Sequence, residues 1–156
     1  LGLVGSEMCI RDSSNLHCRY SRHMSDLPTN SPDTFGTASH SGAAALTALN
    51  LLDLAPDTDP RRSRPGVQRV LSAAGANLIL FSFAPGQCLP DHKAAHPITV
   101  QVLRGELRFG CGEDSITLSP GKIVHLPAYE VHNVEAVVDD TSDFTPSVLL
   151  LTMLTN

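Results

Sequence analysis

Two stretches of this sequence decide its fold. Residues 85–105 read PGQCLPDHKAAHPITVQVLRG, and residues 121–136 read GKIVHLPAYEVHNVEA. Each stretch holds a short apolar run that is rich in β-branched residues, 98–103 in the first and 123–126 in the second. Gly and Pro bracket both runs, which is typical of short strands separated by tight turns. We therefore expect each of the two apolar runs to be a β-strand.

The same pattern of short apolar runs separated by turn residues continues on either side of these stretches. Further strands are predicted at 67–73, 77–84, 106–109, 115–118, 132–138 and 148–154. No helical pattern lies between them, so the sequence predicts an all-β fold, an antiparallel sandwich or barrel. The last strand is apolar nearly throughout, which predicts that both of its faces are covered.

The chain divides into three segments. Residues 1–40 are expected to be a disordered or artefactual arm, 41–65 a short helix and linker, and 66–156 the barrel domain. The helix is predicted over 41–55, because leucines and alanines recur there at helical spacing and Pro56 ends the pattern.

The first residues resemble something other than a protein family. Residues 3–13, LVGSEMCIRDS, resemble the translated read-through of a sequencing adapter. We therefore expect Met24 to be a plausible true start, and roughly the first twenty residues to pack against nothing.

Composition excludes several classes of function. The 156 residues are 42% hydrophobic, with 11 Lys and Arg against 16 Asp and Glu. This balance gives no basic stripe for nucleic acid, and no apolar run approaches the length of a membrane span. No secretion signal is visible either, so a cytoplasmic location is the expectation.

Two spaced motifs give the chain a family resemblance. Gly86 is followed by five residues and then His92, and Gly105 closes that segment; further on, Gly121, Pro127 and His132 are spaced in a similar way. In this order, the two motifs resemble those of the cupin superfamily. The resemblance implies an RmlC-like double-stranded β-helix, or jelly-roll barrel, which is commonly a homodimer.

The resemblance also implies a metal site. Cupins of the metal-binding kind hold Mn, Fe, Ni, Cu or Zn with three histidines and one carboxylate. His92 and His132 match two of these ligands, whereas Ala94 and Ile98 stand at the other two positions. His96 could replace one missing ligand from the loop before the strand, or it could simply be a loop histidine facing solvent.

Other residues are candidates for the cavity wall. Alternation along the strand points Ile98 and Val100 inward and Gln101 to the opposite face, unless the register slips by one residue. Gln101 is thus either an additional ligand or a polar residue of the sheet or of a dimer contact. Tyr129 replaces a motif glycine, where it could narrow the entrance or offer its phenol to a ligand.

Three functions remain open. The first is a small cupin with a degenerate divalent-metal site at His92, His96 and His132 and no assigned reaction. The second is a metal-free cupin that binds a small molecule or acts as a sensor, for which an inward apolar run is suited. The third is a barrel kept for protein interaction. The first two differ in whether the three histidines converge on one point.

Overall fold

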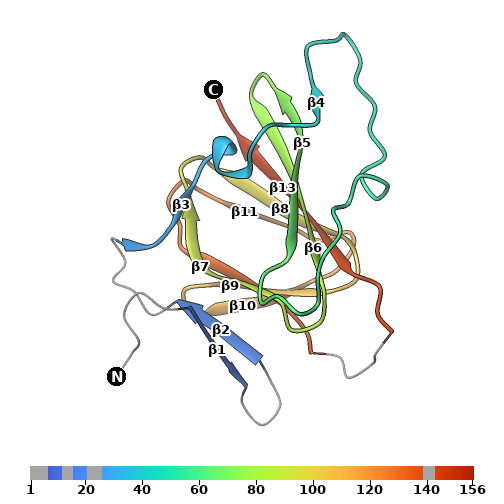
Figure 1. Cartoon of the computed structure of the whole chain (residues 1–156). Helices are drawn as coiled ribbons and strands as arrows, with labels where there is room; N and C mark the ends of the chain where they lie inside the picture. The colour runs from blue at the N-terminus through green and yellow to red at the C-terminus, as the bar shows by residue number, and fades with distance from the viewer. Residues whose placement is uncertain (1–6, 12–15, 21–25, 139–142) are drawn as a thin grey trace.

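The structure, a computed structural model, describes residues 7–11, 16–20, 26–138 and 143–156. The described part is almost entirely β-structure (Figure 1). In chain order the elements are β1 (Glu7–Arg11), β2 (Leu16–Tyr20), β3 (Thr29–Asn30), the 3-10 helix η2 (Pro32–Phe35), β4 (His40–Ser41), β5 (Gly66–Ala73), β6 (Ala76–Phe83), β7 (Cys88–Ala94), β8 (Ile98–Arg104), β9 (Leu107–Cys111), β10 (Asp114–Leu118), β11 (Ile123–Leu126), β12 (His132–Ala136) and β13 (Ser147–Leu154). Within these residues, no helix has the length and apolar character to span a membrane.

Two sheets form the barrel. One has five strands in the order β10-β9-β12-β7-β3, and the other has six in the order β11-β8-β13-β6-β5-β4. The strands from β5 to β13 pair with one another antiparallel, as predicted. By contrast, β3 pairs with β7 in parallel, and β4 pairs with β5 in parallel. The prediction of a purely antiparallel fold is therefore wrong. The reason is that the segment before the barrel adds one short strand to an edge of each sheet.

The core lies between the two sheets and follows the predicted alternation. On β8, Ile98, Val100 and Val102 are buried, and they pack with side chains of β6, β9 and β13. Gln101 lies between them in sequence and is only half-buried, which agrees with a side chain on the other face of the sheet.

Strand β7 was not predicted. The sequence predicts no strand between residues 84 and 98, whereas Cys88–Ala94 is a strand that pairs with β12. Pro90 hides this strand from sequence reasoning, because proline removes a donor from a sheet ladder. The structure accommodates Pro90 where the register of β7 with β12 shifts, outside the short pairing of β7 with β3.

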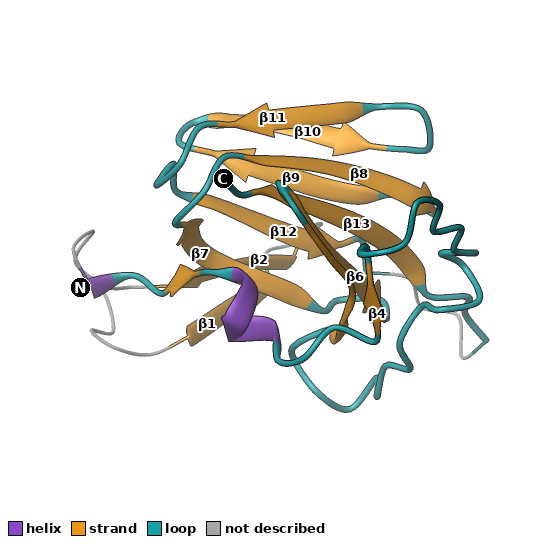
Figure 2. Cartoon of the chain, turned by 90° about the horizontal axis from the view of Figure 1, so that it is seen from above, coloured by secondary structure: helices purple, strands orange, loops and turns teal. Residues whose placement is uncertain are grey.

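The predicted N-terminal helix over 41–55 is wrong. This segment forms turns and irregular loop (Figure 2). Leu51, Leu54 and Ala55 pack against a small cluster on the outer face of the six-stranded sheet, whereas Leu46 is 84% exposed. A short isolated helix is marginal in water, and here too few of its leucines meet an apolar surface to stabilise one. The same contacts cover the outer face of β13, so both of its faces are covered, as predicted.

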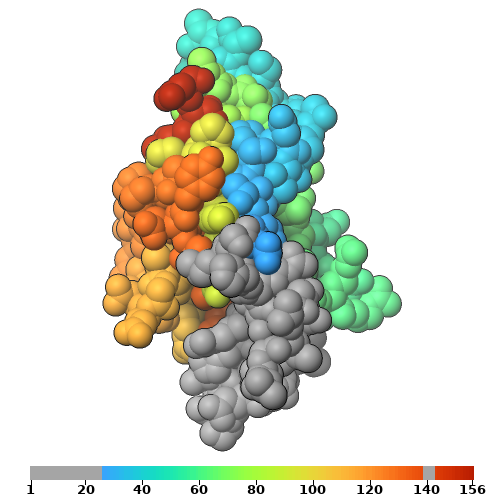
Figure 3. Space-filling model, turned by 90° about the vertical axis from the view of Figure 1, so that its left-hand side faces the viewer, coloured from blue at the N-terminus to red at the C-terminus, as the bar shows by residue number. Residues whose placement is uncertain are grey.

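Residues 26–40, predicted to be part of a poorly ordered arm, lie against the barrel wall (Figure 3). The Phe35 ring packs edge-on against Phe81, with ring centroids 5.7 Å apart. Arg69 on β5 ties this arm down, because its Nη1 donates to the Gly36 carbonyl at 3.0 Å and its Nη2 donates to Asn77 Oδ1 at 2.6 Å. The arm is thus part of the barrel's surface.

Strands β1 and β2 form an antiparallel hairpin, and β2 lies beside β7 and β12. We expected the first twenty or so residues to pack against nothing, but the backbone of β2 lies against the barrel. The adapter-like origin of residues 3–13 stays a prediction, and Met24 lies outside the described residues.

Candidate functional site

A cavity of about 310 Å³ lies inside the barrel. Its wall is mainly apolar, and it includes side chains from both sheets, from the arm and from the segment just before β5. Among the larger apolar side chains that line it are Phe35, Phe81, Phe109, Leu149, Leu151 and Met153. Its volume is near the lower end of the range for small-molecule sites.

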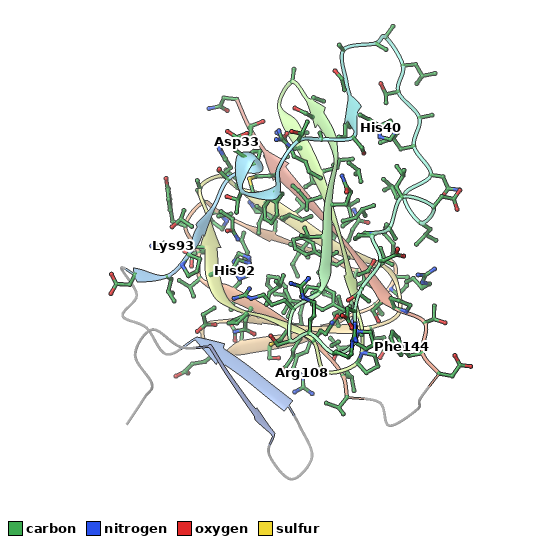
Figure 4. The ribbon with its side chains drawn as sticks, viewed as in Figure 1. Asp33, His40, His92, Lys93, Arg108 and Phe144 are labelled. Atoms are coloured by element: carbon green, nitrogen blue, oxygen red, sulfur yellow. The ribbon has the colours of Figure 1, made fainter. Side chains whose placement is uncertain are left out.

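Two histidines stand together on this wall. His92 on β7 and His132 on β12 are paired in register, and their ring centroids lie 4.2 Å apart at an interplanar angle of 61°. His92 extends toward the barrel interior and the next residue, Lys93, extends away from it (Figure 4). Phe109 stacks on the His132 ring at 5.5 Å, which fixes that ring from the other side.

Hydrogen bonds set the tautomer of both rings. Nδ1 of His92 lies 2.8 Å from the Pro90 carbonyl oxygen, and Nδ1 of His132 lies 2.9 Å from the Glu130 carbonyl oxygen. A carbonyl oxygen can only accept, so each Nδ1 carries the hydrogen and donates it. In a neutral ring, Nε2 is then left with its lone pair as an acceptor for a ligand.

The surroundings keep both rings neutral. Burial, and to a smaller extent the neighbouring His132, lower the pKa of His92 to about 3. Burial also lowers the pKa of His132, although the Asp91 carboxylate acts in the opposite direction. The cavity therefore presents two uncharged acceptors at neutral pH.

This burial predicts that the protein loses stability in acid. An unfolded histidine takes up a proton near its ordinary pKa of 6.5, whereas folded His92 stays neutral down to about pH 3. The unfolded state thus binds more protons between these values, so stability is full above pH 6.5 and falls as the pH is lowered. From about pH 7.5 to about pH 5, His92 should cost about 2 kcal/mol of unfolding free energy. Urea denaturation of wild type and His92→Asn at both pH values measures this, and an equal loss in the two proteins would contradict it.

The remaining candidate residues divide between the cavity and the outside. Ile98 and Val100 line the cavity. Gln101 and Tyr129 do not belong to its wall, and the Tyr129 side chain is 60% exposed. His96 lies in the bend between β7 and β8 and is not part of the wall either.

The residues present do not fit a metal ion held by the protein alone. In the described part of the chain, no three His, Cys, Asp or Glu side chains come close enough to hold one. The predicted ligand set of His92, His96 and His132 is therefore not assembled, because the bend carries His96 away from the cavity wall. Ala94 and Ile98 do line the cavity, but their side chains have no donor atoms.

Two charged residues of the wall, Asp91 and Arg64, are not among the predicted site residues, because solvated surface is the favoured interpretation of Asp91 from the sequence and no motif includes Arg64. Asn133 Nδ2 donates to Asp91 Oδ1 at 2.7 Å, which links β12 to β7 beside the histidine pair. Asp91 directly precedes His92 in the sequence and Asn133 directly follows His132, and this proximity was the available signal that both belong to the site. Arg64 lies in the predicted linker, where no local pattern distinguishes it from its arginine neighbours.

Tyr129 has a strained backbone conformation, and it stands at a position where the cupin motif has glycine. Its φ is 67°, in the left-handed region, and its amide donates to the Ala94 carbonyl at 2.7 Å. Because a non-glycine residue in this region costs roughly 1–2 kcal/mol, Tyr129→Gly should stabilise the fold by about 1 kcal/mol. Thermal unfolding measures the gain. Tyr129→Ala is the control, since it removes the ring and keeps the strain, and an equal gain there would contradict the explanation.

Comparisons with known proteins agree with this architecture. No family model matches the chain, and no curated protein matches it. Among solved structures, an RmlC-like cupin protein from Desulfovibrio desulfuricans is similar at 27% identity and a TM-score of 0.57, covering 70% of this chain and 96% of that one. A cupin superfamily protein from Desulfitobacterium hafniense is similar at 19% identity and a TM-score of 0.56, covering 70% and 92%.

An enzyme also shares the fold. A DMSP lyase from Ruegeria pomeroyi is similar at 18% identity and a TM-score of 0.50, covering 60% of this chain and 48% of that one. Likeness at this level shows architecture and not chemistry, because one barrel hosts many functions. Together the comparisons show that this chain has the cupin fold, as its two motifs predict.

Proposed function

We propose that this small cupin-fold chain binds a largely apolar small molecule inside the barrel, and that His92 and His132 accept hydrogen bonds from it. A pair of neutral imidazoles on an apolar wall, with His132 buried and His92 half-buried, carries this proposal. Both Nδ1 atoms are used by backbone carbonyls, so Nε2 is the atom that each ring has left for a ligand.

The two acceptors determine which kind of ligand should bind in the cavity. Two acceptors in an apolar cavity favour a molecule with hydroxyl or N–H donors, because a buried acceptor left without a donor costs about 1–3 kcal/mol. A hydrocarbon of the same shape should bind less well, since it would displace water from both rings and replace none of its hydrogen bonds.

Phenol and toluene, which differ by a donor, test the proposal. Titration followed by NMR should show that phenol binds the wild type more tightly than toluene does. His92→Phe and His132→Phe keep a ring in place but remove the acceptor, so each should weaken phenol binding by about tenfold and leave toluene binding unchanged. The proposal is wrong if neither probe shifts signals from the cavity, or if the variants bind phenol as wild type does.

A divalent metal site is the second candidate, and it requires the bend between β7 and β8 to move so that His96 joins His92 and His132. The hydrogen bonds from Nδ1 to carbonyl oxygens favour it, because metal-binding histidines are commonly oriented in this way. Plasma mass spectrometry of untagged wild type, His92→Ala and His132→Ala decides between the candidates. We expect no stoichiometric metal in any of the three. Near-stoichiometric metal in wild type that both variants lose would overturn the metal-free proposal.

A further inference from the structure

The polar side chains of the cavity wall are not shared evenly between the two sheets. Every described wall residue that comes from β5, β6, β8 or β13, all in the six-stranded sheet, is apolar. The polar wall residues that come from strands all belong to the five-stranded sheet, and they are Asn30, Asp91, His92 and His132. The two sheets therefore give the cavity one apolar face and one face that can form hydrogen bonds.

Asn30 reaches the polar face because the arm adds a strand to that sheet. β3 pairs with β7 in parallel, with Asn30 opposite Ala94. The Lys93 amide donates to the Pro28 carbonyl at 3.0 Å, and the Ala95 amide donates to the Asn30 carbonyl at 2.8 Å, so the backbone of Asn30 is held in place. Residues opposite each other on neighbouring strands share a face of the sheet, and Asn30 and Ala94 both line the cavity.

Asn30 lies within reach of a small molecule that contacts the histidine pair. His132, His92 and Asn30 stand on three neighbouring strands, β12, β7 and β3, and His132 is opposite His92. Asn30 is one strand further over and, like Ala94, two residues further along than His92. With strands about 4.8 Å apart and a rise of about 3.3 Å per residue, the Cα atoms of Asn30 and His92 are about 8 Å apart.

Asn30 adds a donor to a row of acceptors. Nε2 of each neutral histidine can only accept, and so can the Asp91 carboxylate, whose Oδ1 already accepts from Asn133. The Asn30 amide has two N–H donors, and within the part of the chain that the structure describes no hydrogen bond engages its side chain. Asn30 is thus the strand residue of this wall that can donate to a ligand.

We infer that Asn30 is a specificity-determining residue, which donates from Nδ2 to a carbonyl oxygen of the ligand while the ligand's hydroxyl or N–H group meets the histidine pair. The apolar body of the ligand then lies against the six-stranded sheet. The ligand class is a hydroxylated carbonyl compound with an apolar body. This inference rests on the proposed function and adds a second polar group to the ligand.

The test compares 4-hydroxyacetophenone with 4-ethylphenol, which have nearly the same shape and share the hydroxyl, although only the first has a carbonyl oxygen. In calorimetry at neutral pH, wild type should bind the ketone about fivefold more tightly. Asn30→Leu and Asn30→Ala should both abolish this preference and keep the affinity for 4-ethylphenol, because neither side chain can donate. Thr29→Val is the matched control, since this exposed neighbour on β3 is not part of the wall, and it should leave the preference intact.

The outcomes separate this inference from the proposed function. Equal binding of the two compounds by wild type, or binding of phenol but of neither larger compound, overturns the carbonyl recognition and leaves ligand binding standing. A preference that survives both Asn30 variants arises from the hydroxyl group and overturns the assignment to Asn30. Loss of both compounds in both variants also overturns it, because Asn30 would then support the wall instead of reading the carbonyl. If neither compound binds wild type and phenol does not bind either, both proposals are overturned.

Discussion

Replacing Ala94 with His and Ile98 with Glu is expected to give a protein that retains about one divalent metal ion per chain. The expectation follows from where the side chains lie. His92, Ala94, Ile98 and His132 occupy the four positions that the family resemblance assigns to metal ligands, and all four line the same cavity. The two histidines already stand together, with their Nδ1 atoms held by carbonyl oxygens. What the cavity lacks is donor atoms on the remaining two side chains.

A matched control uses the same residue types one position along. Ala95→His with Thr99→Glu places the new Glu on the neighbouring position of β8, where alternation turns the side chain to the other face of the sheet. Metal content by plasma mass spectrometry, after loading with Mn, Fe or Zn and dialysis, should be near stoichiometric for the first pair and at background for the second. Equal metal content in the two variants would contradict the placement of Ala94 and Ile98.

Stability gives an independent readout of the same variant. Without metal, a Glu in place of Ile98 buries a carboxyl in an apolar wall, so the apoprotein should melt below wild type. Metal that binds only the folded state should restore stability, by about 2.7 kcal/mol when its free concentration is a hundred times its Kd. A melting temperature that does not respond to metal would contradict the same prediction.

Local patterns were enough to predict most of the strands. On β8 the alternation of Ile98, Val100 and Val102 gave both the strand and its buried face, because one residue of slip would have moved all three to solvent. The same patterns failed where a segment's structure depends on a partner. Strand β7 contains Pro90 and becomes a strand through its pairing with β12, which no local signal reveals.

In the N-terminal half of the molecule, local patterns also failed to predict structure that depends on tertiary contacts. Helical spacing over 41–55 was a real pattern, but Leu51 and Leu54 are buried by a loop that packs on the sheet instead of by a helix. The parallel pairing of β3 with β7 joins residues more than sixty positions apart, which spacing within a segment cannot predict.

The site was predictable to the extent that it lies in the two motifs. Spacing identified His92 and His132, and their register across β7 and β12 brings the rings into contact. The direction of His96 depends on how the bend between β7 and β8 packs, so the sequence left it open. Arg64 reaches the cavity from a separate segment, and only tertiary structure places it there.

Gln87→Leu is expected to cause the largest loss of stability among single substitutions outside the apolar core. Gln87 is 2% exposed, and its side chain makes four hydrogen bonds. Its Oε1 accepts from the Ala84 amide at 2.8 Å and from Thr58 Oγ1 at 2.7 Å, and its Nε2 donates to the carbonyls of Asp59 at 2.8 Å and Arg62 at 3.0 Å. Leucine has a similar size but none of these groups, so it would leave backbone atoms without partners. The unfolding free energy should fall by about 3 kcal/mol or more, measured by urea denaturation.

Two comparisons show whether hydrogen bonding is the cause. Gln68→Leu removes a half-buried amide that donates one hydrogen bond, to the Arg69 carbonyl at 3.0 Å, so it should cost less than about 1 kcal/mol. Gln87→Glu keeps the two accepting contacts but sets a carboxylate oxygen against two carbonyl oxygens. It should therefore be destabilised at neutral pH and recover part of the loss, relative to wild type, when acid protonates the carboxyl.

The effect of Gln87 should extend to ligand binding in the cavity. Its hydrogen bonds hold the segment from Thr58 to Arg62 against the barrel, and the residues that follow directly, Arg64 and Pro65, line the cavity. With those bonds removed, this part of the wall would be held less firmly, so Gln87→Leu should weaken the binding of phenol and of toluene alike, whereas Gln68→Leu should change neither. A Gln87→Leu protein with wild-type stability and wild-type affinity for both compounds would show that this segment is held by something other than the Gln87 side chain.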